Sequence, residues 1–434
     1  MTCSFVPRHS RPRTRSCAIR GKLSRECNPP EQEEDWGFHN PQDLLLLLSF
    51  FPNSKGVEHS VKFRADRDTL LETLVTASRA TSARSGSGFG IAGLKLHLRG
   101  HQLEVCGSDP DLVIEARCEV AGDVDGSVLV PSRLVVDIVR SFEPGAVTVV
   151  GGDEDVRFSS GRAEFLVRVA VGAEITRLGV PEQEGIAIPG AVFADGLRQV
   201  VRAALVDDSR APQLTGVLMV ATGGGLRLIA TDSYRLAFRD FAGMTVVEPG
   251  GHVLVPAKAL AEVQRLAASG KTDEDRVIIF RHSDLDAVFD LSDVRITTRL
   301  LRGQFPEVER LIPASYAYHL HVARDDLEAA LRRVRLVVRD TKDATTPVRL
   351  ALHTGGVDLT VLTPESGRAE ESVEGDFVGD DLTVAFNPGY LLDGVEAVRA
   401  DTLILEVNDP GKPALVRGQG EDEYRYLLMP VKVS

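Results

Sequence analysis

The sequence has no run of apolar residues long enough to cross a bilayer as a helix, which takes about 20 residues. Its longest apolar run is Leu44–Leu48, followed by Ser49 and then Phe50 and Phe51. Aromatic residues make up 6% of the chain and Trp36 is the single tryptophan, yet apolar residues reach 43%. The sequence therefore predicts no membrane-spanning helix, but several hydrophobic cores. At about 100–200 residues per domain, its length allows about two to four domains.

Cysteine is also scarce. Cys3, Cys17 and Cys27 lie near the N-terminus, and Cys106 and Cys118 complete the set of five. An odd number without regular spacing predicts neither a disulfide framework nor a zinc site. We therefore expect a reducing, cytoplasmic environment and no metal.

The familiar catalytic motifs are missing too: a nucleophile elbow, a Gly-Lys-Ser/Thr phosphate loop and H-E-x-x-H. Residues 88–93 fit the dinucleotide pattern G-x-G-x-x-G, with Asp109 and Asp111 about 20 residues further on. That pattern needs a strand before it and a helix after it. Here a Ser/Gly-rich loop precedes it and an alternating strand at 94–98 follows. We expect no cofactor and no catalysis; an enzyme that uses this loop stays an alternative that a cofactor-binding assay would test.

The net charge of −13 argues against a protein that coats itself in nucleic acid by bulk attraction. An acidic protein that handles DNA must concentrate its Lys and Arg on one surface. Local basic surfaces are therefore compatible with this composition.

Residues 1–60 differ in composition from the rest of the chain. Residues 1–25 carry six Arg, one Lys and no acidic residue, whereas residues 31–35 are almost all acidic. An Arg-rich, acid-poor start occurs in transit peptides, but the acidic patch fits that class poorly. We expect a disordered or non-native extension, with ordered sequence from about residue 57–61.

One pattern occurs three times in residues 61–434, which predicts three similar domains. Each copy opens with an amphipathic helix in which apolar residues recur at spacings of four and three, placing them on one face. The three sets are Asp68, Leu70, Leu74 and Ala77; Asp195, Leu197, Val201 and Ala204; and Asp325, Leu327, Leu331 and Val334.

Each copy continues with an alternating hairpin that has a glycine-containing turn, then a second helix with proline at its start, then more strands. The prolines are Pro131, Pro256 and Pro388. This order predicts an α+β protein whose domains span residues 61–182, 183–313 and 314–434.

Four stretches resemble the bacterial DNA polymerase III β subunit family, the sliding clamps. They are residues 214–218 (LTGVL), 230–237 (ATDSYRLA), 302–308 (RGQFPEV) and 426–431 (YLLMPV). The second stretch is the most specific of them. The likeness covers residues 61–434 without large gaps, and the four stretches follow one another in the family's order.

The resemblance implies three clamp-fold domains per chain and a head-to-tail homodimer that closes into a six-domain ring, with helices inside and antiparallel sheets outside. Such a ring is a processivity factor with no catalytic step of its own. It encircles double-stranded DNA without reading sequence and tethers the polymerase III α subunit, the clamp loader and other proteins that carry a clamp-binding motif. Twelve helices, each about 10 Å wide, would line a hole about 28 Å across, which is wide enough for a duplex.

By the same resemblance, partner proteins insert a short apolar peptide into a groove between the second and third domains. Its expected apolar wall is Leu214, Thr231, Leu236, Pro306, Leu311, Leu427 and Met429. Polar or mobile edge residues would be Tyr234, Arg235, Arg310, Asn387 and Tyr390, and Pro430 and Val431 continue the C-terminal tail. An apolar groove that contains Met offers an adaptable surface to several partners.

A ring that slides should attract phosphates diffusely, since base-specific bonds would pin it. The candidate DNA-facing cations lie on the helices and adjoining loops of all three copies. They are Arg79, Arg84, Arg133, Arg140, Arg198, Arg202, Arg210, Lys258, Arg265, Arg332, Arg333, Arg335 and Arg339. Asp and Glu occupy the same helices, so we expect the inner surface to be only modestly less acidic than the outside.

The loop at residues 84–93 departs from the family pattern, in which a proline-containing turn leads into the next strand. Two alternatives to the ordinary clamp therefore stay open. One is a specialised second clamp copy with altered partner or inhibitor binding. The other is a monomeric DNA-binding scaffold, which its solution mass would reveal.

Overall fold

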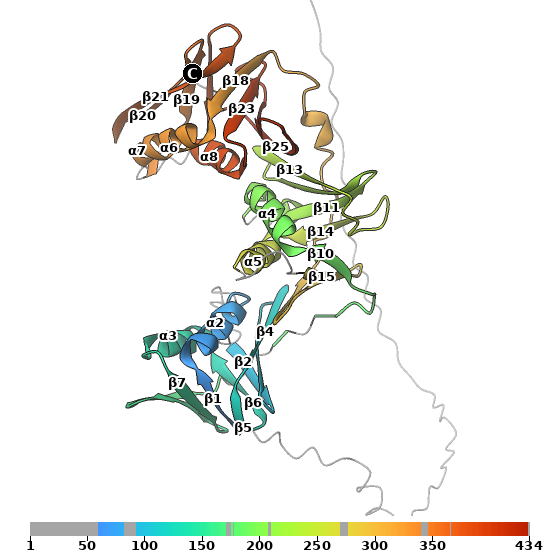
Figure 1. The fold of residues 1–434 in the computed structure, drawn as a ribbon, viewed down its shortest axis with the longest axis vertical. Helices are drawn as coiled ribbons and strands as arrows, with labels where there is room; N and C mark the ends of the chain where they lie inside the picture. The colour runs from blue at the N-terminus through green and yellow to red at the C-terminus, as the bar shows by residue number, and fades with distance from the viewer. Residues whose placement is uncertain are drawn as a thin grey trace, which may run out of the picture. The chain divides into compact units, whose positions relative to one another are not determined.

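The computed structural model describes residues 60–81, 93–170, 175–176, 178–206, 210–269, 277–339, 346–364 and 366–432. The expected extension, apart from Ser60, and the loop at 84–93, apart from Gly93, lie outside these residues. Within them the chain is α+β and forms three domains that repeat one order of elements (Figure 1).

The first domain packs helices α2 (Arg67–Ser78) and α3 (Ser132–Ser141) side by side. Its strands are β1 (Val61–Asp66), β2 (Gly93–Arg99), β3 (Gln102–Ser108), β4 (Leu112–Glu119), β5 (Ala121–Val124), β6 (Gly126–Pro131), β7 (Ala146–Gly151), β8 (Asp155–Ser160) and β9 (Ala163–Arg168). Leu70, Leu74 and Ala77 of α2 are fully buried, as their spacing predicts. The Asp66 carboxylate accepts hydrogen bonds from the backbone N–H groups of Asp68 and Thr69 and so fixes the start of this helix.

The second domain has helices α4 (Gly190–Val200) and α5 (Ala257–Ala268), again in contact with each other. Its strands are β10 (Ile186–Pro189), β11 (Gly216–Thr222), β12 (Gly225–Thr231), β13 (Arg235–Ala242), β14 (His252–Pro256), β15 (Val277–His282), β16 (Asp286–Leu291) and β17 (Val294–Arg299). Short 3-10 turns are η1 (Val201–Ala203), η2 (Pro212–Thr215) and, in the connection to the next domain, η3 (Glu309–Leu311).

The third domain pairs helix α6 (Arg324–Val334) with α8 (Pro388–Ala397), and a short helix α7 (Leu336–Arg339) follows α6. Its strands are β18 (Tyr318–Ala323), β19 (Val348–His353), β20 (Gly356–Thr363), β21 (Gly367–Val378), β22 (Leu382–Phe386), β23 (Thr402–Val407), β24 (Ala414–Gly418) and β25 (Glu421–Leu428). The predicted helices and hairpins are thus present in all three copies.

One feature of the repeat was predicted incorrectly. Each domain opens with a strand (β1, β10 or β18) rather than with its first helix. In β1 the residues alternate between buried Val61, Phe63 and Ala65 and exposed neighbours, a strand pattern too short to stand out beside the helix that follows. Pro131 and Pro256 also precede the first helical residue by one position, and only Pro388 occupies it.

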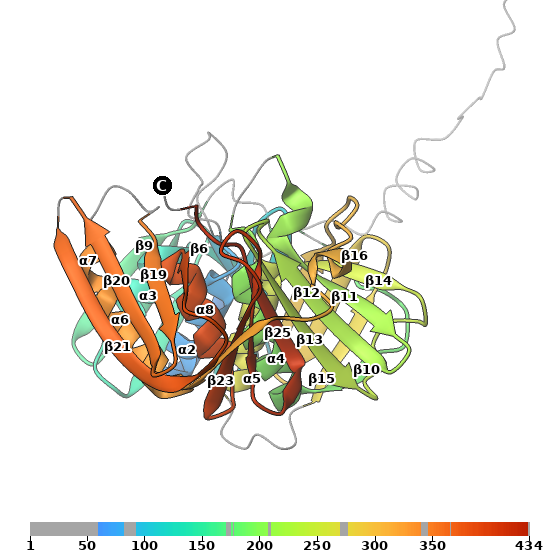
Figure 2. The ribbon, with the colours of Figure 1, turned by 90° about the horizontal axis from the view of Figure 1, so that it is seen from above.

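Strand pairing continues across both domain junctions. β17 of the second domain pairs antiparallel with β4 of the first, with Ile296 opposite Ile114. β13 of the second domain pairs antiparallel with β25 of the third, with Leu236 opposite Leu427, and Figure 2 shows these two strands side by side. The eight-stranded and twelve-stranded sheets therefore each pass from one domain into the next. The twelve-stranded sheet places residues of β12, β13 and β25 on a common surface.

Candidate partner groove and charged helix surface

A row of apolar side chains crosses the junction between the second and third domains. Thr231 on β12 is opposite Leu236 on β13, which is opposite Leu427 on β25, and Leu427 is opposite Leu415 on β24. Directly paired residues of antiparallel strands project to the same face. All four side chains are buried, and three of the expected wall residues are thereby brought together.

The segment that connects the second and third domains covers part of this face. Val308 packs into a small core with Leu236, Leu427 and residues on the same face of the strands, and Phe305 and Ile312 lie against it. This core is separate from the main cores of the domains. The strands and the connecting segment together form the wall of the candidate groove.

Several expected groove residues remain exposed around this core. The exposed fractions are 64% for Tyr234, 55% for Leu311 and 44% for Met429, and Pro306 is exposed as well. The backbone N–H of Met429 donates to the Tyr234 carbonyl at 2.9 Å, which ties the tail to the β12–β13 turn. Exposed apolar side chains gathered beside a buried apolar wall are typical of an interaction surface.

The β12–β13 turn explains why the second family-like stretch has its particular residues. The Asp232 carboxylate accepts from the backbone N–H groups of Tyr234 and Arg235, and the Thr231 hydroxyl donates to the Arg235 carbonyl. Ser233 has a φ of 77°, which a small residue with local hydrogen bonds tolerates best. These side chains set the direction in which Tyr234 leaves the turn.

Arg235 is buried at the edge of the row rather than free to move. It is 8% exposed, its Nε donates to Asp232 at 3.0 Å, and its Nη1 donates to Asp393. Its guanidinium lies 4.3 Å from the ring centroid of Tyr390. Burial alone would lower the pKa of Arg235, but interactions with Tyr426 and Asp393 outweigh burial and raise that pKa.

The remaining expected groove residues serve different roles. Asn387 caps α8 through bonds from the N–H groups of Gly389 and Tyr390, and the Val431 N–H donates to the Ala385 carbonyl at 2.8 Å. Pro430, between two hydrogen-bonded tail residues, is half-buried. Arg310 is exposed and pairs with Glu307, and Leu214 is buried on η2.

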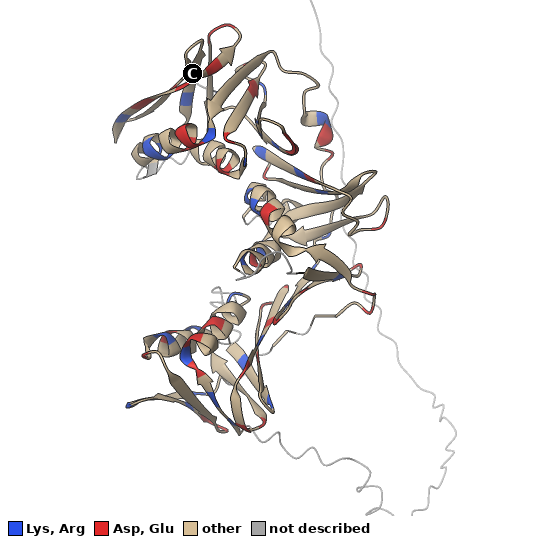
Figure 3. Ribbon diagram, in the orientation of Figure 1, with Lys and Arg blue, Asp and Glu red and all other residues tan. Residues whose placement is uncertain are grey.

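Most of the candidate DNA-facing cations are paired with carboxylates, and Figure 3 shows both signs of charge on the helices. Two pairs cross between the first and second domains, Arg79 with Glu262 at 3.3 Å and Lys258 with Asp109. The other paired cations are Arg140 with Asp137, Arg198 with Asp195, Arg202 with Glu396, Arg265 with Glu262, Arg332 with Glu328 and Glu396, and Arg333 with Glu371.

The other candidate cations divide into three groups. Arg133 and Arg335 are exposed and have no carboxylate partner within the described part of the chain. Arg210 is exposed and has an interaction of its own. Arg84 and the side chain of Arg339 lie outside the described residues. Arg133 and Arg335 are therefore the cations most available to an incoming phosphate.

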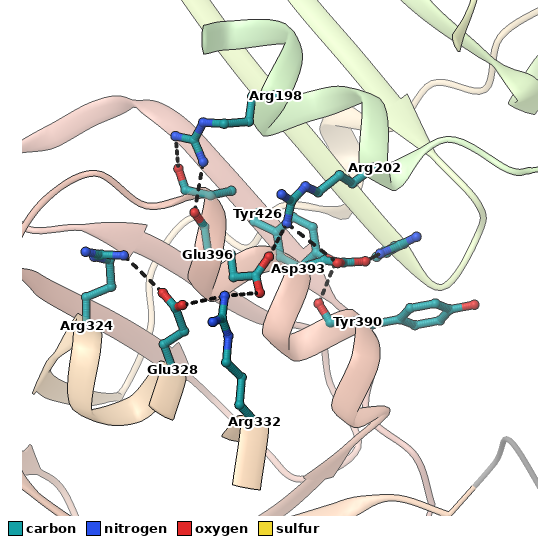
Figure 4. A network of polar contacts seen from close by, with 11 residues as sticks. Arg198, Arg202, Arg324, Glu328, Arg332, Tyr390, Asp393, Glu396 and Tyr426 are labelled. Carbon is teal, nitrogen blue, oxygen red and sulfur yellow. Dashed lines mark hydrogen bonds and ion pairs between the residues drawn. The ribbon is translucent and has the colours of Figure 1, made fainter. Parts of the chain in front are cut away.

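A network of arginines and carboxylates joins the second and third domains on the helix side (Figure 4). Arg198 donates to the carbonyl of Glu396 at 2.9 Å, and Gln199 donates to that of Ala397 at 2.9 Å. Arg202 pairs with Glu396 at 2.5 Å, and Arg332 approaches the same carboxylate at 2.9 Å. Burial would raise the pKa of Glu396, but these two arginines outweigh burial and lower that pKa.

The carboxylates of this network were not among the sequence-predicted site residues. Asp393 and Glu396 lie three residues apart on α8, and Asp393 lies three residues after Tyr390, so all three share one side of the helix. That spacing was visible in the sequence. Their partners on the second domain were not, since Arg202 and Glu396 are 194 residues apart.

The described residues show neither a metal site nor a membrane-spanning helix. They contain no group of three or more His, Cys, Asp or Glu side chains placed to hold a metal ion. No helix among them is long and apolar enough to span a bilayer.

Comparison with known proteins agrees with this architecture. Three family models match in order: the N-terminal, central and C-terminal domains of the DNA polymerase III beta subunit, at residues 61–178, 187–307 and 309–432. The beta sliding clamp of Streptomyces coelicolor is 32% identical over 386 residues, covering 86% of this chain and all of that protein. The Staphylococcus aureus beta sliding clamp is 27% identical over 384 residues, covering 86% of this chain and 99% of that protein.

Solved structures give the same result. The Caulobacter crescentus beta sliding clamp superposes with a TM-score of 0.75 and 26% identity, covering 87% of this chain and all of that one. A Bartonella birtlesii sliding clamp bound to griselimycin superposes with a TM-score of 0.76 and 26% identity, covering 86% of this chain and all of that one. Since family models span all three domains and a curated relative exceeds 30% identity along its whole length, the chain belongs to the bacterial DNA polymerase III beta subunit family, the sliding clamps.

Proposed function

We propose that two copies of this chain close into a ring around double-stranded DNA and tether the replicative polymerase to it. The proposed ring holds DNA topologically, so its interaction with the duplex needs no sequence readout. It takes no cofactor, performs no catalytic step and acts in the cytoplasm. Its expected partners are the polymerase III α subunit, the clamp loader and other proteins with a clamp-binding motif.

The strand pairing at the two internal junctions is the observation that carries this proposal. The last strand of the second domain, β17, pairs with β4, and the last strand of the third, β25, pairs with β13. The last strand of the first domain is β9, which forms the edge of its sheet. The strand equivalent to β4 and β13 in the third domain is β21, which pairs with β20 along residues 367–374 and with β18 along residues 375–378. Its edge opposite β20 therefore has no strand partner along 367–374 among the described residues.

A second copy offers the missing partner for each of these edges. β9 of one copy would pair with β21 of the other as β17 pairs with β4, and the two equivalent contacts would close a ring. β9 already presents Phe165 and Leu166 with 39% and 62% of their surfaces exposed. Exposed strand edges invite pairing with another chain, and closure of the ring removes them.

The solution mass of a Leu166→Glu variant tests this proposal. A charge placed in an apolar interface should disfavour dimerisation by several kcal/mol. We therefore expect the wild type to have a solution mass of twice 47.0 kDa and the variant a mass of 47.0 kDa. Leu285→Glu alters another exposed leucine, in the β15–β16 turn, and serves as the control, which should remain dimeric. A monomeric wild type would contradict ring closure and favour the monomeric scaffold.

The groove at the second junction gives the ring its second activity. The buried row Thr231, Leu236 and Leu427 and the exposed Leu311 and Met429 offer apolar contacts to a short peptide. Each buried apolar anchor of such a peptide could contribute about 1.5–3 kcal/mol. Several partners whose peptides carry the same type of apolar anchor could therefore bind the same groove in succession.

A further inference from the structure

One side of helix α8 carries three groups that contact arginines of the second and third domains, and Figure 4 shows this network. The ring of Tyr390 lies 4.3 Å from the Arg235 guanidinium. Asp393 pairs with the same arginine, and Glu396 pairs with both Arg202 and Arg332. The three α8 residues are spaced by three, so the contacts form a continuous line along the helix.

The first end of this line is the edge of the candidate groove. Arg235 is adjacent in sequence to Leu236, whose side chain belongs to the apolar row. Because Arg235 is 8% exposed, its position depends on the partners that hold it, Asp232 and Asp393. A change in its bond to Asp393 would therefore change the position of Arg235 at the edge of the candidate groove.

The other end of the line is accessible to solvent. The side chain of Arg332 is 59% exposed and that of Arg202 is 36% exposed. Both were expected among the DNA-facing cations, and a phosphate is a stronger hydrogen-bond acceptor for arginine than water is. Arg202 is the one that also lies near Asp393, at 3.8 Å.

Asp393 is thus shared between two cations. Its Oδ2 binds Arg235 and its Oδ1 faces Arg202. Because both guanidinium groups carry a positive charge near one carboxylate, they repel each other and compete for its hydrogen bonds, which offsets part of the attraction of Asp393 for each. When Arg202 leaves this position, Arg235 is the single one of these two arginines that still contacts the Asp393 carboxylate.

We propose that Asp393 is a positioning residue that transmits the occupancy of Arg202 to the groove edge through Arg235. A phosphate that draws Arg202 away strengthens the bond between Asp393 and Arg235. The groove edge is then better ordered, and a partner peptide binds more tightly when DNA is in the ring. This inference rests on the proposed function of the groove.

The test is the affinity of the full-length protein for a fluorescent peptide that ends in a Leu-x-Leu-Phe anchor. Arg202→Gln should tighten peptide binding about threefold, a size set by the modest coupling of half-exposed charge pairs. Arg332→Gln is the matched control. It removes a cation from Glu396 but not from Asp393, so the peptide affinity should not change.

The Asp393→Asn background separates transmission from a general structural effect. The substitution should itself weaken peptide binding, and adding Arg202→Gln to it should have no further effect. A duplex of about 20 bp should tighten peptide binding to the wild type and leave Asp393→Asn unchanged. If Asp393→Asn does not fold, Arg235→Lys provides the background, since lysine lacks the fork that bridges Asp232 and Asp393.

Three results would overturn the inference. Peptide affinity could be unaffected by Arg202→Gln, or be changed equally in the Asp393→Asn background, or respond as strongly to Arg332→Gln. Each of these leaves the groove itself intact. A folded wild type that binds no peptide is a different result, because it overturns the proposed groove and this inference together.

Discussion

The candidate groove residues differ in burial, so some of them are expected to support folding and others to contact a partner. Leu236 and Leu427 are 3% and 4% exposed and belong to a packed core, so their loss would disturb the junction itself. Met429 keeps 44% of its surface exposed while its backbone is fixed by the Tyr234 carbonyl. Its side chain can therefore be altered with little effect on the fold.

Met429→Ala is expected to weaken binding of the Leu-x-Leu-Phe peptide about tenfold, which corresponds to about 1.4 kcal/mol of lost apolar contact. The melting temperature should stay near that of the wild type. Fluorescence anisotropy measures the affinity, and Leu285→Ala, an exposed leucine away from the groove, is the control. Equal affinities for the wild type and Met429→Ala would place the peptide elsewhere.

The pairing of the helix cations distinguishes residues that otherwise look equivalent in the sequence. Arg335 has no carboxylate partner within the described chain, whereas Arg332 is shared by Glu328 and Glu396. A phosphate would have to compete with two carboxylates for Arg332 but with none for Arg335. The two arginines lie three residues apart, which makes them a matched pair.

Arg335→Gln should therefore weaken binding of a linear duplex more than Arg332→Gln does. If Arg335 neutralises one phosphate, its loss should also reduce the slope of log affinity against log salt by about 0.9. Titrations of a labelled duplex at several salt concentrations measure both quantities. If Arg332→Gln weakened duplex binding more than Arg335→Gln, then pairing with carboxylates would not reduce the contribution of an arginine to DNA binding.

At the scale of elements, the α8 helix ties the third domain to the second. Its C-terminal carbonyls accept from Arg198 and Gln199, and its Glu396 carboxylate accepts from Arg202. The strand pairing of β13 with β25 makes a second tie on the sheet side. The junction is therefore held on both sides, by charge on one and by backbone hydrogen bonds on the other.

The charged side of this junction should be sensitive to acid. The pKa of Glu396 is lowered in the folded chain, so its stabilising effect is present above the carboxylate's ordinary pKa and is lost as pH falls through the lower, folded value. From about pH 4.5 downward, the melting temperature of the wild type should therefore fall more steeply than that of Glu396→Gln. Parallel melting curves for the two proteins would contradict this role for Glu396.

The sequence allowed much of the fold to be predicted, because the helix periodicity at Leu70, Leu74 and Ala77 and its two counterparts is local. The opening strands were missed since β10 is only four residues long and β1 runs directly into a helix. Family-like stretches such as residues 230–237 singled out Thr231, Leu236 and Leu427, which lie opposite one another in the structure, whereas their role in a partner groove stays a prediction. The ion pairs of α8 could not be predicted, because Asp393 and Glu396 resemble an ordinary solvated helix face until distant residues are placed against them.

For the whole molecule, the central question is whether DNA is held by topology or by direct contact. Net charge is −13 and most helix cations are already paired, which leaves little attraction to grip a duplex tightly. A ring does not need such a grip, since a closed circle of DNA cannot leave it. Topological retention is therefore the property that separates a clamp from a DNA-binding scaffold.

The most direct measurement is retention on circular DNA before and after the circle is cut. The protein is placed on a singly nicked plasmid with a clamp loader, unbound protein is removed by gel filtration, and one sample is linearised at a single site. Protein that travels with the circle and leaves the linear form, whatever the sequence of the plasmid, is the result that a sliding ring predicts. Protein that stays on linear DNA, or never remains on the circle, would contradict the proposed function.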